Sequence, residues 1–380
     1  MNLIHIADTH LGLAAFSRLD PNTGMNLREK QIYDNFLRGI NDIINAKPDA
    51  LVHAGDLFDT VKPKTKAYTT VLEALERLRA ADIPLIIIAG NHSMTKTRYT
   101  TSPYEVLTYH PGQIKAAYKF RYEKEEIGDT VFHLLPNMLR PEDYRTEFEK
   151  IELSKTHKNV LVTHGLATQI KDKRLATVAE HELDGTILSD QFDYIALGHY
   201  HRQSQVTDNA WYSGSTEYLT YGEIKDEKGG LIVDTGRHTV EHLELPKTPM
   251  KDLGTIACEG VHPGDITDEI IARVGKASLP TGAMAQITLD QLCREDGRGI
   301  DMKQLAGIRE GLLDLKIRVR SAEEDTVQPL QQDIRMIDYL QEFSLFIDRQ
   351  QLSVKQKAFV ANRGKEILAQ VMEEHRGEVE

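Results

Sequence analysis

The sequence predicts an α/β layered fold with functional residues at the carboxyl ends of its strands. Short apolar runs rich in Ile, Leu and Val alternate with longer stretches of helical spacing over the first two thirds of the chain. Each apolar run breaks into a short polar cluster. Because ligands collect at the carboxyl ends of strands in such folds, the polar clusters predict a site.

The expected elements alternate in order along the chain. Apolar runs that end in Gly or polar residues are typical of buried strands, and five occur here, at 3–6, 50–54, 85–89, 160–162 and 194–197. Apolar residues with helical spacing occupy 29–46 and 66–81, between the first three runs. Strands therefore alternate with helices, as in an α/β protein.

Seven residues of the polar clusters have side chains that bind divalent metals: Asp8, His10, Asp56, Asn91, His164, His199 and His201. Carboxylate, amide and imidazole without thiolate suit Mn²⁺, Fe²⁺ or Zn²⁺ and disfavour a structural zinc site. Seven ligands exceed the need of one tetrahedral ion, whereas two ions about 3.5–4 Å apart can share one carboxylate. Asp56 is the expected bridge. Isolated histidines near strand ends are more often structural, and we expect this of His5, His53, His133, His157 and His181.

The clusters D-x-H, G-D-x-x-D, G-N-H, T-H-G and G-H-x-H occur in an order that resembles the calcineurin-like metallophosphoesterase superfamily. The later segments Y-S-G-S-T-E at 212–217, Y-G-E at 221–223 and K-G at 228–229 look like those of the SbcD nucleases, whose archaeal and eukaryotic members repair double-strand breaks. This resemblance covers about the first two thirds of the chain. It implies a two-sheet metallophosphoesterase sandwich flanked by helices.

The resemblance also implies how the ligands divide between two divalent ions. One ion would take Asp8, His10, Asp56 and His201, and the other Asp56, Asn91, His164 and His199. Mn²⁺ is the expected metal, with Fe²⁺ and Zn²⁺ as alternatives. His92 follows a ligand directly and would stabilise the transition state or protonate the leaving oxygen.

Two positions depart from the pattern of the relatives. Archaeal members commonly carry a His three residues after the bridging Asp, where this chain has Asp59, as the bacterial branch does. An acidic residue usually follows the G-N-H cluster, where this chain has Ser93. Neither departure removes a metal ligand. Asp59 would support a ligand or cap a loop.

Length and composition fit an intracellular enzyme of two or three domains. The two cysteines, Cys258 and Cys293, provide neither a disulfide framework nor metal spacing. No signal-peptide pattern opens the sequence and no apolar run reaches membrane-spanning length. We expect a cytoplasmic protein without a membrane partner.

The formal net charge of −12 is unfavourable for DNA binding, but basic residues gather after three of the ligands. The expected DNA contacts are Lys62, Lys64, Lys66, Lys96, Arg98, Lys171, Lys173 and Arg174. Tyr99 or Tyr104 is a candidate to stack on an unpaired base. The alternative is that these lysines and arginines are solvated residues of surface loops.

Residues 1–245 form the expected nuclease domain, and the organisation changes after Leu245. Residues 250–328 predict a small α+β domain with strands at 255–258, 283–289 and 315–319 and helices at 266–274 and 302–313. The resemblance implies that this domain caps one side of a DNA groove.

A C-terminal helical hairpin is expected at 333–376, after a linker at 321–332. Its apolar residues recur at helical spacing, with Met336, Leu340, Phe343 and Ile347 in one helix and Val360, Gly364, Ile367 and Val371 in the other. The resemblance implies that this segment binds an SMC-like ATPase of the SbcC type. A hairpin folded back on the capping domain is the alternative.

The leading functional hypothesis is a Mn²⁺-dependent DNA nuclease, with 3′–5′ exonuclease and single-strand endonuclease activity, that processes breaks as a homodimer with this ATPase. The stretches 68–78 and 104–107 are candidate dimer faces, unless their apolar residues are core. A phosphoesterase acting on nucleotides, phosphoproteins or other small esters is a second possibility. Thr60 argues against its serine/threonine phosphatase form, which has an Arg there. A non-catalytic DNA-end tether is the third.

Overall fold

The computed structural model describes residues 1–95, 100–170, 182–183 and 185–320, and a few positions between 347 and 364. The chain divides into two units, Met1–Ser321 and Ala322–Glu380. Nearly all of the second unit lies outside the described residues, and so do Met336, Leu340, Phe343, Ile367 and Val371. Of the candidate partner contacts in the hairpin, Ile347 is buried and Val360 is 38% exposed. The hairpin therefore stays a prediction.

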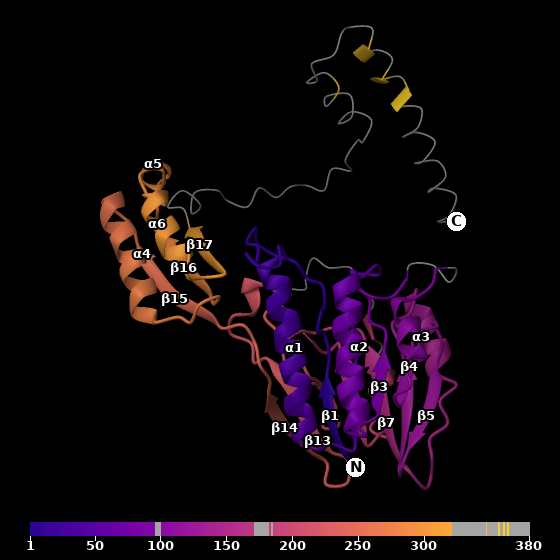
Figure 1. The fold of residues 1–380 in the computed structure, drawn as a ribbon. Helices are drawn as coiled ribbons and strands as arrows, with labels where there is room; N and C mark the ends of the chain where they lie inside the picture. Colours follow the sequence, from indigo (N-terminus) through magenta and orange to yellow (C-terminus); the bar gives the residue numbers. More distant parts are fainter. Residues whose placement is uncertain are drawn as a thin grey trace. The chain divides into compact units, whose positions relative to one another are not determined.

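Two six-stranded sheets form the framework of the first unit (Figure 1). The first has the order β14-β13-β1-β2-β3-β4, with β1 at Asn2–Ile6, β2 at Ala50–His53, β3 at Leu85–Ile88, β4 at Ile114–Ala117, β13 at Gly229–Asp234 and β14 at Thr239–Glu244. The second has the order β11-β12-β10-β7-β6-β5, with β5 at Glu123–Ile127, β6 at Thr130–Leu135, β7 at Lys158–His164, β10 at Tyr194–Gly198, β11 at Ser204–Gln205 and β12 at Ala210–Tyr212. A separate pair is formed by β8 (Leu166–Ala167) and β9 (Glu182–Leu183).

Parallel pairing brings the functional ends of the strands together. In the first sheet β1 to β4 are parallel neighbours, and in the second β6, β7, β10 and β12 are. All five predicted strands occur among them, with bounds within two residues of those expected. Their carboxyl ends consequently lie at one edge of each sheet.

Helices cover the outer faces of the sheets. The helices are α1 (Leu27–Asn45), α2 (Thr65–Ala80) and α3 (Pro141–Phe148), with 3₁₀ turns η1 (Pro103–Tyr109), η3 (Gly185–Ile187) and η4 (Tyr221–Glu223). Figure 1 shows α1 and α2 side by side over the first sheet. The Asn26 side chain caps α1 by accepting from the backbone N–H of Glu29. No helix among these residues combines the length and apolar character that crossing a membrane requires.

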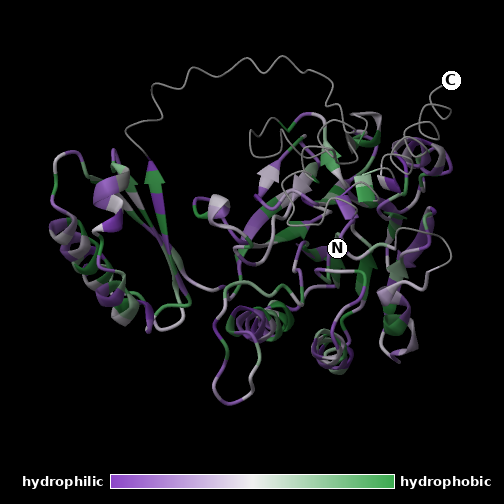
Figure 2. Ribbon diagram, turned by 90° about the horizontal axis from the view of Figure 1, so that it is seen from above, coloured by the Kyte–Doolittle hydropathy of each residue, from purple (hydrophilic) through white to green (hydrophobic). Residues whose placement is uncertain are grey.

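The two sheets pack face to face, and this explains why their central strands are largely apolar. Leu3 of β1 belongs to a core cluster shared with strands of the second sheet, such as Phe132 of β6. Its neighbour Ile4 faces the opposite way, into the cluster beneath the helices. Figure 2 shows the hydrophobic residues of the strands gathered inside, while the helices seen end-on carry polar outer faces. Strands covered on both faces need apolar residues at every position.

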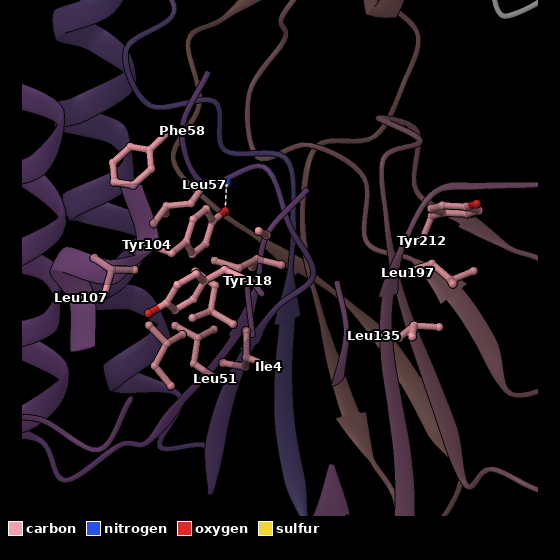
Figure 3. Close-up of a cluster of buried hydrophobic side chains, with 14 of the residues drawn as sticks. Ile4, Leu51, Leu57, Phe58, Tyr104, Leu107, Tyr118, Leu135, Leu197 and Tyr212 are labelled. Carbon is pink, nitrogen blue, oxygen red and sulfur yellow. Dashed lines mark hydrogen bonds between the residues drawn. The ribbon is translucent and has the colours of Figure 1, made fainter. Parts of the chain in front are cut away.

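The candidate dimer faces are largely core. Leu75 and Leu78 of α2 and Leu107 of η1 are buried, as is Tyr104. Figure 3 shows Tyr104 and Leu107 packed with Phe58 and Leu57 in the core under the helices. The apolar spacing of these two stretches therefore reflects packing within one chain.

A third sheet belongs to residues 250–320. Its order is β15-β16-β17, all parallel, with β15 at Met250–Ala257, β16 at Met284–Asp290 and β17 at Asp314–Arg320, and the helices are α4 (Pro263–Ala277), α5 (Arg294–Arg298) and α6 (Met302–Arg309). The sheet and helices enclose their own core cluster. All five predicted elements occur, but β15 begins five residues early, α6 ends four residues early and α4 is three residues longer at each end. The short helix α5 was not predicted. The role of this part as a cap on DNA stays a prediction.

Two arginines connect this part to the sandwich. Buried Arg28 of α1 donates to the Glu217 carboxylate at 3.1 Å and to the Thr248 hydroxyl at 2.7 Å, just before β15. Arg18 donates to the backbone carbonyls of Glu310 and Arg309 at 2.8 Å each, at the end of α6. Side-chain donors to the free carbonyls of a helix end stabilise that end.

Candidate metal centre

All seven predicted ligands extend from loops at the shared strand ends. Asp8 and His10 follow β1, Asp56 follows β2, and Asn91 follows β3. His164 ends β7, and His199 and His201 follow β10. Backbone hydrogen bonds tie the first two loops together, because Asp8 N–H donates to the Gly55 carbonyl and His10 N–H to the Asp56 carbonyl, at 3.0 Å each.

The ligand atoms converge into two overlapping groups around the carboxylates. Asp8, His10 and His201 have ligand atoms within 4.8 Å of one another, and so do Asp8, Asp56 and His164. The Oδ2 of Asp56 lies 3.3 Å from His164 Nε2 and 4.0 Å from His10 Nε2. Asp56 thus lies between imidazoles of both predicted ligand sets, as a bridging ligand must.

Asn91 connects the remaining predicted ligands. Its Oδ1 lies 2.8 Å from His164 Nε2 and 3.0 Å from His199 Nδ1. The backbone N–H of His199 donates to both oxygens of Asp8, at 3.1 and 3.0 Å. Each of the seven residues therefore contacts another of the seven or has a ligand atom close enough to another's to share one metal ion.

Three imidazoles are oriented by acceptors on Nδ1. His10 Nδ1 lies 3.1 Å from Asp59 Oδ1, His201 Nδ1 lies 3.1 Å from Glu223 Oε1, and His164 Nδ1 lies 2.8 Å from the Ala54 carbonyl. A proton held on Nδ1 leaves the Nε2 lone pair for a metal. His10 Nε2 is buried and has no hydrogen-bond partner among the described residues, which is the state of a ligand nitrogen. The donor set therefore fits divalent cations.

The electrostatic field at the site favours positive charge. Burial by itself raises the pKa of the Asp56 carboxyl, but the facing imidazoles, His164 foremost, hold that pKa well below its usual range. Burial alone lowers the pKa of His164, yet the Asp56 carboxylate raises it to about 9. A bound cation would satisfy the same field and release the proton.

Four ligands adopt a backbone conformation that costs energy. The φ angles of Asp8, His10 and Asp56 are 52°, 45° and 52°, and that of His199 is 102°. Non-glycine residues seldom adopt positive φ, and when they do they gather at functional sites. The loops are therefore strained at the residues that would bind metal.

Three glycines make room for the buried ligands. A Cβ on Gly55 would lie 2.2 Å from His164 Nδ1, and one on Gly90 would lie 2.4 Å from Asp56 Oδ1. A Cβ on Gly198 would lie 1.9 Å from the Ala54 carbonyl oxygen. The glycines that precede Asp56, Asn91 and His199 are thus required by close packing around Asp56 and His164.

His92 lies at the exposed margin of the site. Its backbone N–H donates to Asp56 Oδ1 at 2.9 Å, and its Nδ1 lies 3.3 Å from the Asp59 carbonyl oxygen. The ring packs edge-on against His10, with centroids 4.7 Å apart. With Nδ1 turned to Asp59, Nε2 is the nitrogen left for another group.

Sequence reasoning missed two residues that support the site. Buried Glu223 holds His201, and buried Lys228 donates to Glu223 Oε2 at 2.7 Å and to the His201 carbonyl at 2.8 Å. Burial raises the pKa of Glu223, but the hydrogen bond from His201 and the charge of Lys228 lower it to about 2. Glu223 belongs to the Y-G-E segment and Lys228 to the K-G segment that resemble the SbcD nucleases. That resemblance was the only sequence signal that pointed to these two residues.

The expected DNA contacts are only partly described. Lys62, Lys64 and Lys66 are exposed beside the site, and Lys64 pairs with buried Glu29 at 2.7 Å. Lys96, Arg98, Tyr99, Lys171, Lys173 and Arg174 lie outside the described residues. Tyr104 was wrong as a stacking candidate, because it is fully buried and its hydroxyl bonds to Leu57 N–H and the Ser93 hydroxyl.

The expectation of structural roles holds for three of the five other histidines. His5 Nδ1 lies 2.8 Å from the Tyr194 hydroxyl of the second sheet, and His53 Nε2 lies 3.0 Å from the Thr9 hydroxyl; both histidines are buried. His133 is buried against Asn159. His157 is near the surface, and His181 lies outside the described residues.

Strand-end carboxylates, imidazoles and an amide around one centre form a site that could hold divalent metal ions, the arrangement that two-metal phosphoesterases use. The sequence profile of the calcineurin-like phosphoesterase family matches residues 1–203, and the chain belongs to this family.

The chain is similar to archaeal proteins named DNA double-strand break repair protein Mre11. It is 31% identical to the protein from Methanocaldococcus jannaschii, over 65% of this chain and 66% of that one. It is 29% identical to the protein from Methanococcus maripaludis, over 60% of both chains, and 29% identical to that from Sulfolobus acidocaldarius, over 62% and 60%. The match thus spans about 60–66% of the length of these relatives.

Proposed function

We propose that this protein is a metal-dependent phosphodiesterase that cleaves DNA during the repair of double-strand breaks. The observation that carries the proposal is the convergence of Asp8, His10, Asp56 and His164 around one centre. Membership of the calcineurin-like phosphoesterase family supports the reaction class. Similarity to Mre11 proteins supports DNA as the substrate.

Each residue of the site has a proposed role in hydrolysis. Asp8, His10, Asp56 and His201 would hold one ion, and Asp56, Asn91, His164 and His199 a second. Two divalent ions, with Mn²⁺ as our choice, supply the chemistry of polarising the phosphodiester and generating hydroxide near neutral pH. His92, at the open margin, would place its Nε2 against the phosphate and donate a hydrogen bond or proton to the leaving oxygen.

The test compares substrates, metal and variants in one series. The full chain is incubated with linear duplex DNA, a DNA hairpin and para-nitrophenyl phosphate esters, with Mn²⁺ and with EDTA. We expect Mn²⁺-dependent DNA cleavage that falls at least about 100-fold in Asp56→Asn and His92→Gln. The exposed residues Asp208 and His238 provide the matched controls Asp208→Asn and His238→Gln, which should cleave normally.

The alternatives give different results in the same series. Cleavage of the small esters alone would show a phosphoesterase of another substrate class. DNA binding without cleavage would show a tether. DNA cleavage that persists in EDTA or in Asp56→Asn would refute the two-metal mechanism itself.

Lys62 and Lys66 are our proposed contacts to the DNA backbone. Both are exposed in the segment that leads from Asp59 into α2. Lys64 is excluded from the test because its removal would leave Glu29 without its partner. Replacing both lysines by Ala should weaken DNA binding and make the slope of log affinity against log salt shallower by about 1 to 2. The control is Lys47→Ala with Lys155→Ala, which precede β2 and β7 at the opposite sheet edges; an equal loss there would contradict the proposal.

The partner proposal concerns residues 333–376. We propose that this segment binds an SMC-like ATPase of the SbcC type, and that the protein acts as a homodimer in the cytoplasm. Deleting residues 330–380 should abolish co-purification with the ATPase and retain Mn²⁺-dependent cleavage. Loss of folding in the deleted protein would instead favour a hairpin packed on the rest of the chain.

A further inference from the structure

One buried tyrosine, Tyr104, joins two loops of the candidate metal centre. Its hydroxyl accepts from the backbone N–H of Leu57 at 3.2 Å and lies 3.0 Å from the Ser93 hydroxyl oxygen. Figure 3 shows the hydroxyl of Tyr104 turned toward Leu57. Leu57 directly follows Asp56, and Ser93 directly follows His92. The phenol therefore connects the loop of the expected bridging ligand with the loop of the expected catalytic histidine.

The same two loops also meet at the Asp56 carboxylate. The backbone N–H of His92 donates to Asp56 Oδ1 at 2.9 Å. The backbone of Asp56 has a φ of 52°, a conformation that the surrounding contacts must enforce. The carbonyl of Leu57, the next residue, accepts from the backbone N–H of Leu11 at 2.9 Å. Tyr104 holds the N–H of this same residue, so the chain directly after Asp56 is fixed at both ends of Leu57.

Tyr104 is itself held firmly enough to support a loop. It is fully buried and begins the turn η1, where its backbone N–H donates to the Ser102 side chain at 3.3 Å. Its ring packs edge-on against Phe58, with centroids 6.0 Å apart, and lies stacked against Tyr118 at 6.5 Å. A ring packed on two sides leaves its hydroxyl little freedom to move.

Ser93 completes this support. Its side chain is fully buried, where a hydroxyl without a partner would cost free energy. Because the Tyr104 oxygen accepts from Leu57, the phenol proton is available to the Ser93 oxygen. This chain thus has a neutral hydroxyl bonded to Tyr104 at the position where an acidic residue usually follows the G-N-H cluster.

We propose that Tyr104 and Ser93 are positioning residues that set the Asp56 carboxylate against His92. The inference rests on the proposed two-metal function and adds two residues that support it. Tyr104 bonds directly to the Asp56 loop, whereas Ser93 acts through Tyr104. Both side chains are fully buried, so they act through the loops and not on the substrate.

The test applies two measurements to the full-length variants Tyr104→Phe and Ser93→Ala and to the double variant. Calorimetric titration of MnCl₂ into EDTA-stripped protein should show an affinity about 10-fold lower in Tyr104→Phe and about 3-fold lower in Ser93→Ala. At saturating Mn²⁺, kcat for linear duplex DNA should fall about 10-fold in Tyr104→Phe with KM unchanged, because Asp56 and His92 move while the DNA contacts stay. The double variant should match Tyr104→Phe, since Ser93 acts through that residue.

Tyr194→Phe is the matched control. It removes a similarly buried hydroxyl, bonded to His5 Nδ1 at 2.8 Å, at the amino end of β10, whereas the ligands follow the carboxyl ends of the strands. We expect this variant to lose stability and to keep the Mn²⁺ affinity and kcat of the wild type. An equal loss of affinity in Tyr194→Phe would show that Tyr104 contributes only to general stability, and would overturn the positioning role.

The remaining results separate this inference from the proposed function. Unchanged Mn²⁺ affinity and kcat in Tyr104→Phe would overturn the positioning role and leave the two-metal function standing. Additive losses in the double variant would overturn the statement that Ser93 acts through Tyr104. The absence of Mn²⁺ binding in the wild type would overturn the proposed function itself. If Tyr104→Phe does not fold, Ser93→Ala decides, and wild-type values in that variant would overturn the inference.

Discussion

The strained backbone at Asp8, His10, Asp56 and His199 shows that the fold itself holds these candidate metal ligands in place. Positive φ at non-glycine residues costs of order 1–3 kcal/mol each, and the surrounding structure must enforce it. Here the enforcing contacts are backbone hydrogen bonds between the β1 and β2 loops and the close packing of glycines against Asp56 and His164. Ligand residues that the fold holds in place in this way lose little conformational freedom on binding.

Gly90→Ala should disable the site without unfolding the protein. The added methyl group would lie 2.4 Å from Asp56 Oδ1 and 2.6 Å from His164 Cε1, so both side chains must move. We expect Mn²⁺ affinity to fall at least about 10-fold, since a small misplacement of ligands is costly at such sites. Calorimetric titration measures this. Gly275→Ala in α4, where nothing lies within 4 Å of the new Cβ, is the control; unchanged affinity in Gly90→Ala would contradict the packing argument.

Tyr104→Phe should destabilise the fold through one lost hydroxyl. That hydroxyl accepts from Leu57 N–H at 3.2 Å and bonds Ser93 at 3.0 Å inside the core. Leaving a buried N–H without an acceptor costs about 1–3 kcal/mol. Urea denaturation in EDTA measures the change in the free energy of unfolding. Tyr109→Phe, at an 80% exposed position, should cost nothing measurable, and an equal loss in both variants would refute this account.

At the scale of elements, the central strands could be predicted from the sequence because the other sheet covers one of their faces and helices cover the other. Residues 85–89 are apolar at every position and 3–6 at every position except His5, and the structure places alternate apolar residues in two different cores. The carboxyl-end rule then predicted where the ligands gather. A strand pattern does not reveal which carboxylate lies behind an imidazole. The contacts of Glu223 to His201 and of Asp59 to His10 could therefore be found only in the structure.

Two elements of residues 250–320, strand β15 and helix α6, have boundaries that the sequence did not predict. Prolines at 246 and 249 suggested a gap, yet β15 begins at Met250, directly after the second one. Its pairing with β16 shifts between Asp252 and Thr255, next to Gly254 with φ of 83°. Helix α6 ends at Arg309, whose carbonyl accepts from Arg18, 291 residues away in sequence. Contacts between such distant residues are not visible in a local sequence pattern.

Arg18→Ala should loosen the C-terminal end of α6. The guanidinium donates to the carbonyls of Arg309, Glu310 and Leu312, at and just beyond the end of this helix. We expect faster amide hydrogen exchange across residues 305–313, with the strands of the two large sheets unaffected. Arg237→Ala, at an exposed arginine of the β13–β14 turn, serves as the control. Unchanged exchange in Arg18→Ala would show that the contact adds nothing to the stability of that helix.

At the scale of the whole molecule, buried histidines make the fold sensitive to acid. Burial lowers the pKa of His5 to about 3 and that of His53 to about 4, from 6.5. Because these folded-state values lie below the unfolded ones, the unfolded chain binds more protons. The stabilising contribution is complete above about pH 6.5 and is lost as the pH falls through the folded values.

The free energy of unfolding of the metal-free protein should therefore fall steeply below pH 6.5. His5 alone accounts for about 3 kcal/mol between pH 6.5 and about pH 4, at about 1.4 kcal/mol per pH unit. Urea denaturation in EDTA at several pH values measures the slope. His5→Gln should flatten it by about one proton, while His238→Gln at an exposed position should not. A slope that is the same in all three proteins would contradict this assignment.

The central position of β1 in its sheet affects how the chain folds during synthesis. Strand β1 lies between β2 and β13, so its second edge stays unpaired until residues 229–234 have been synthesised. Lys228, which secures the support of His201, emerges at the same moment. Strand edges that wait unpaired invite association with other chains. This strand edge of the nascent polypeptide therefore needs protection until residues 229–234 have been translated.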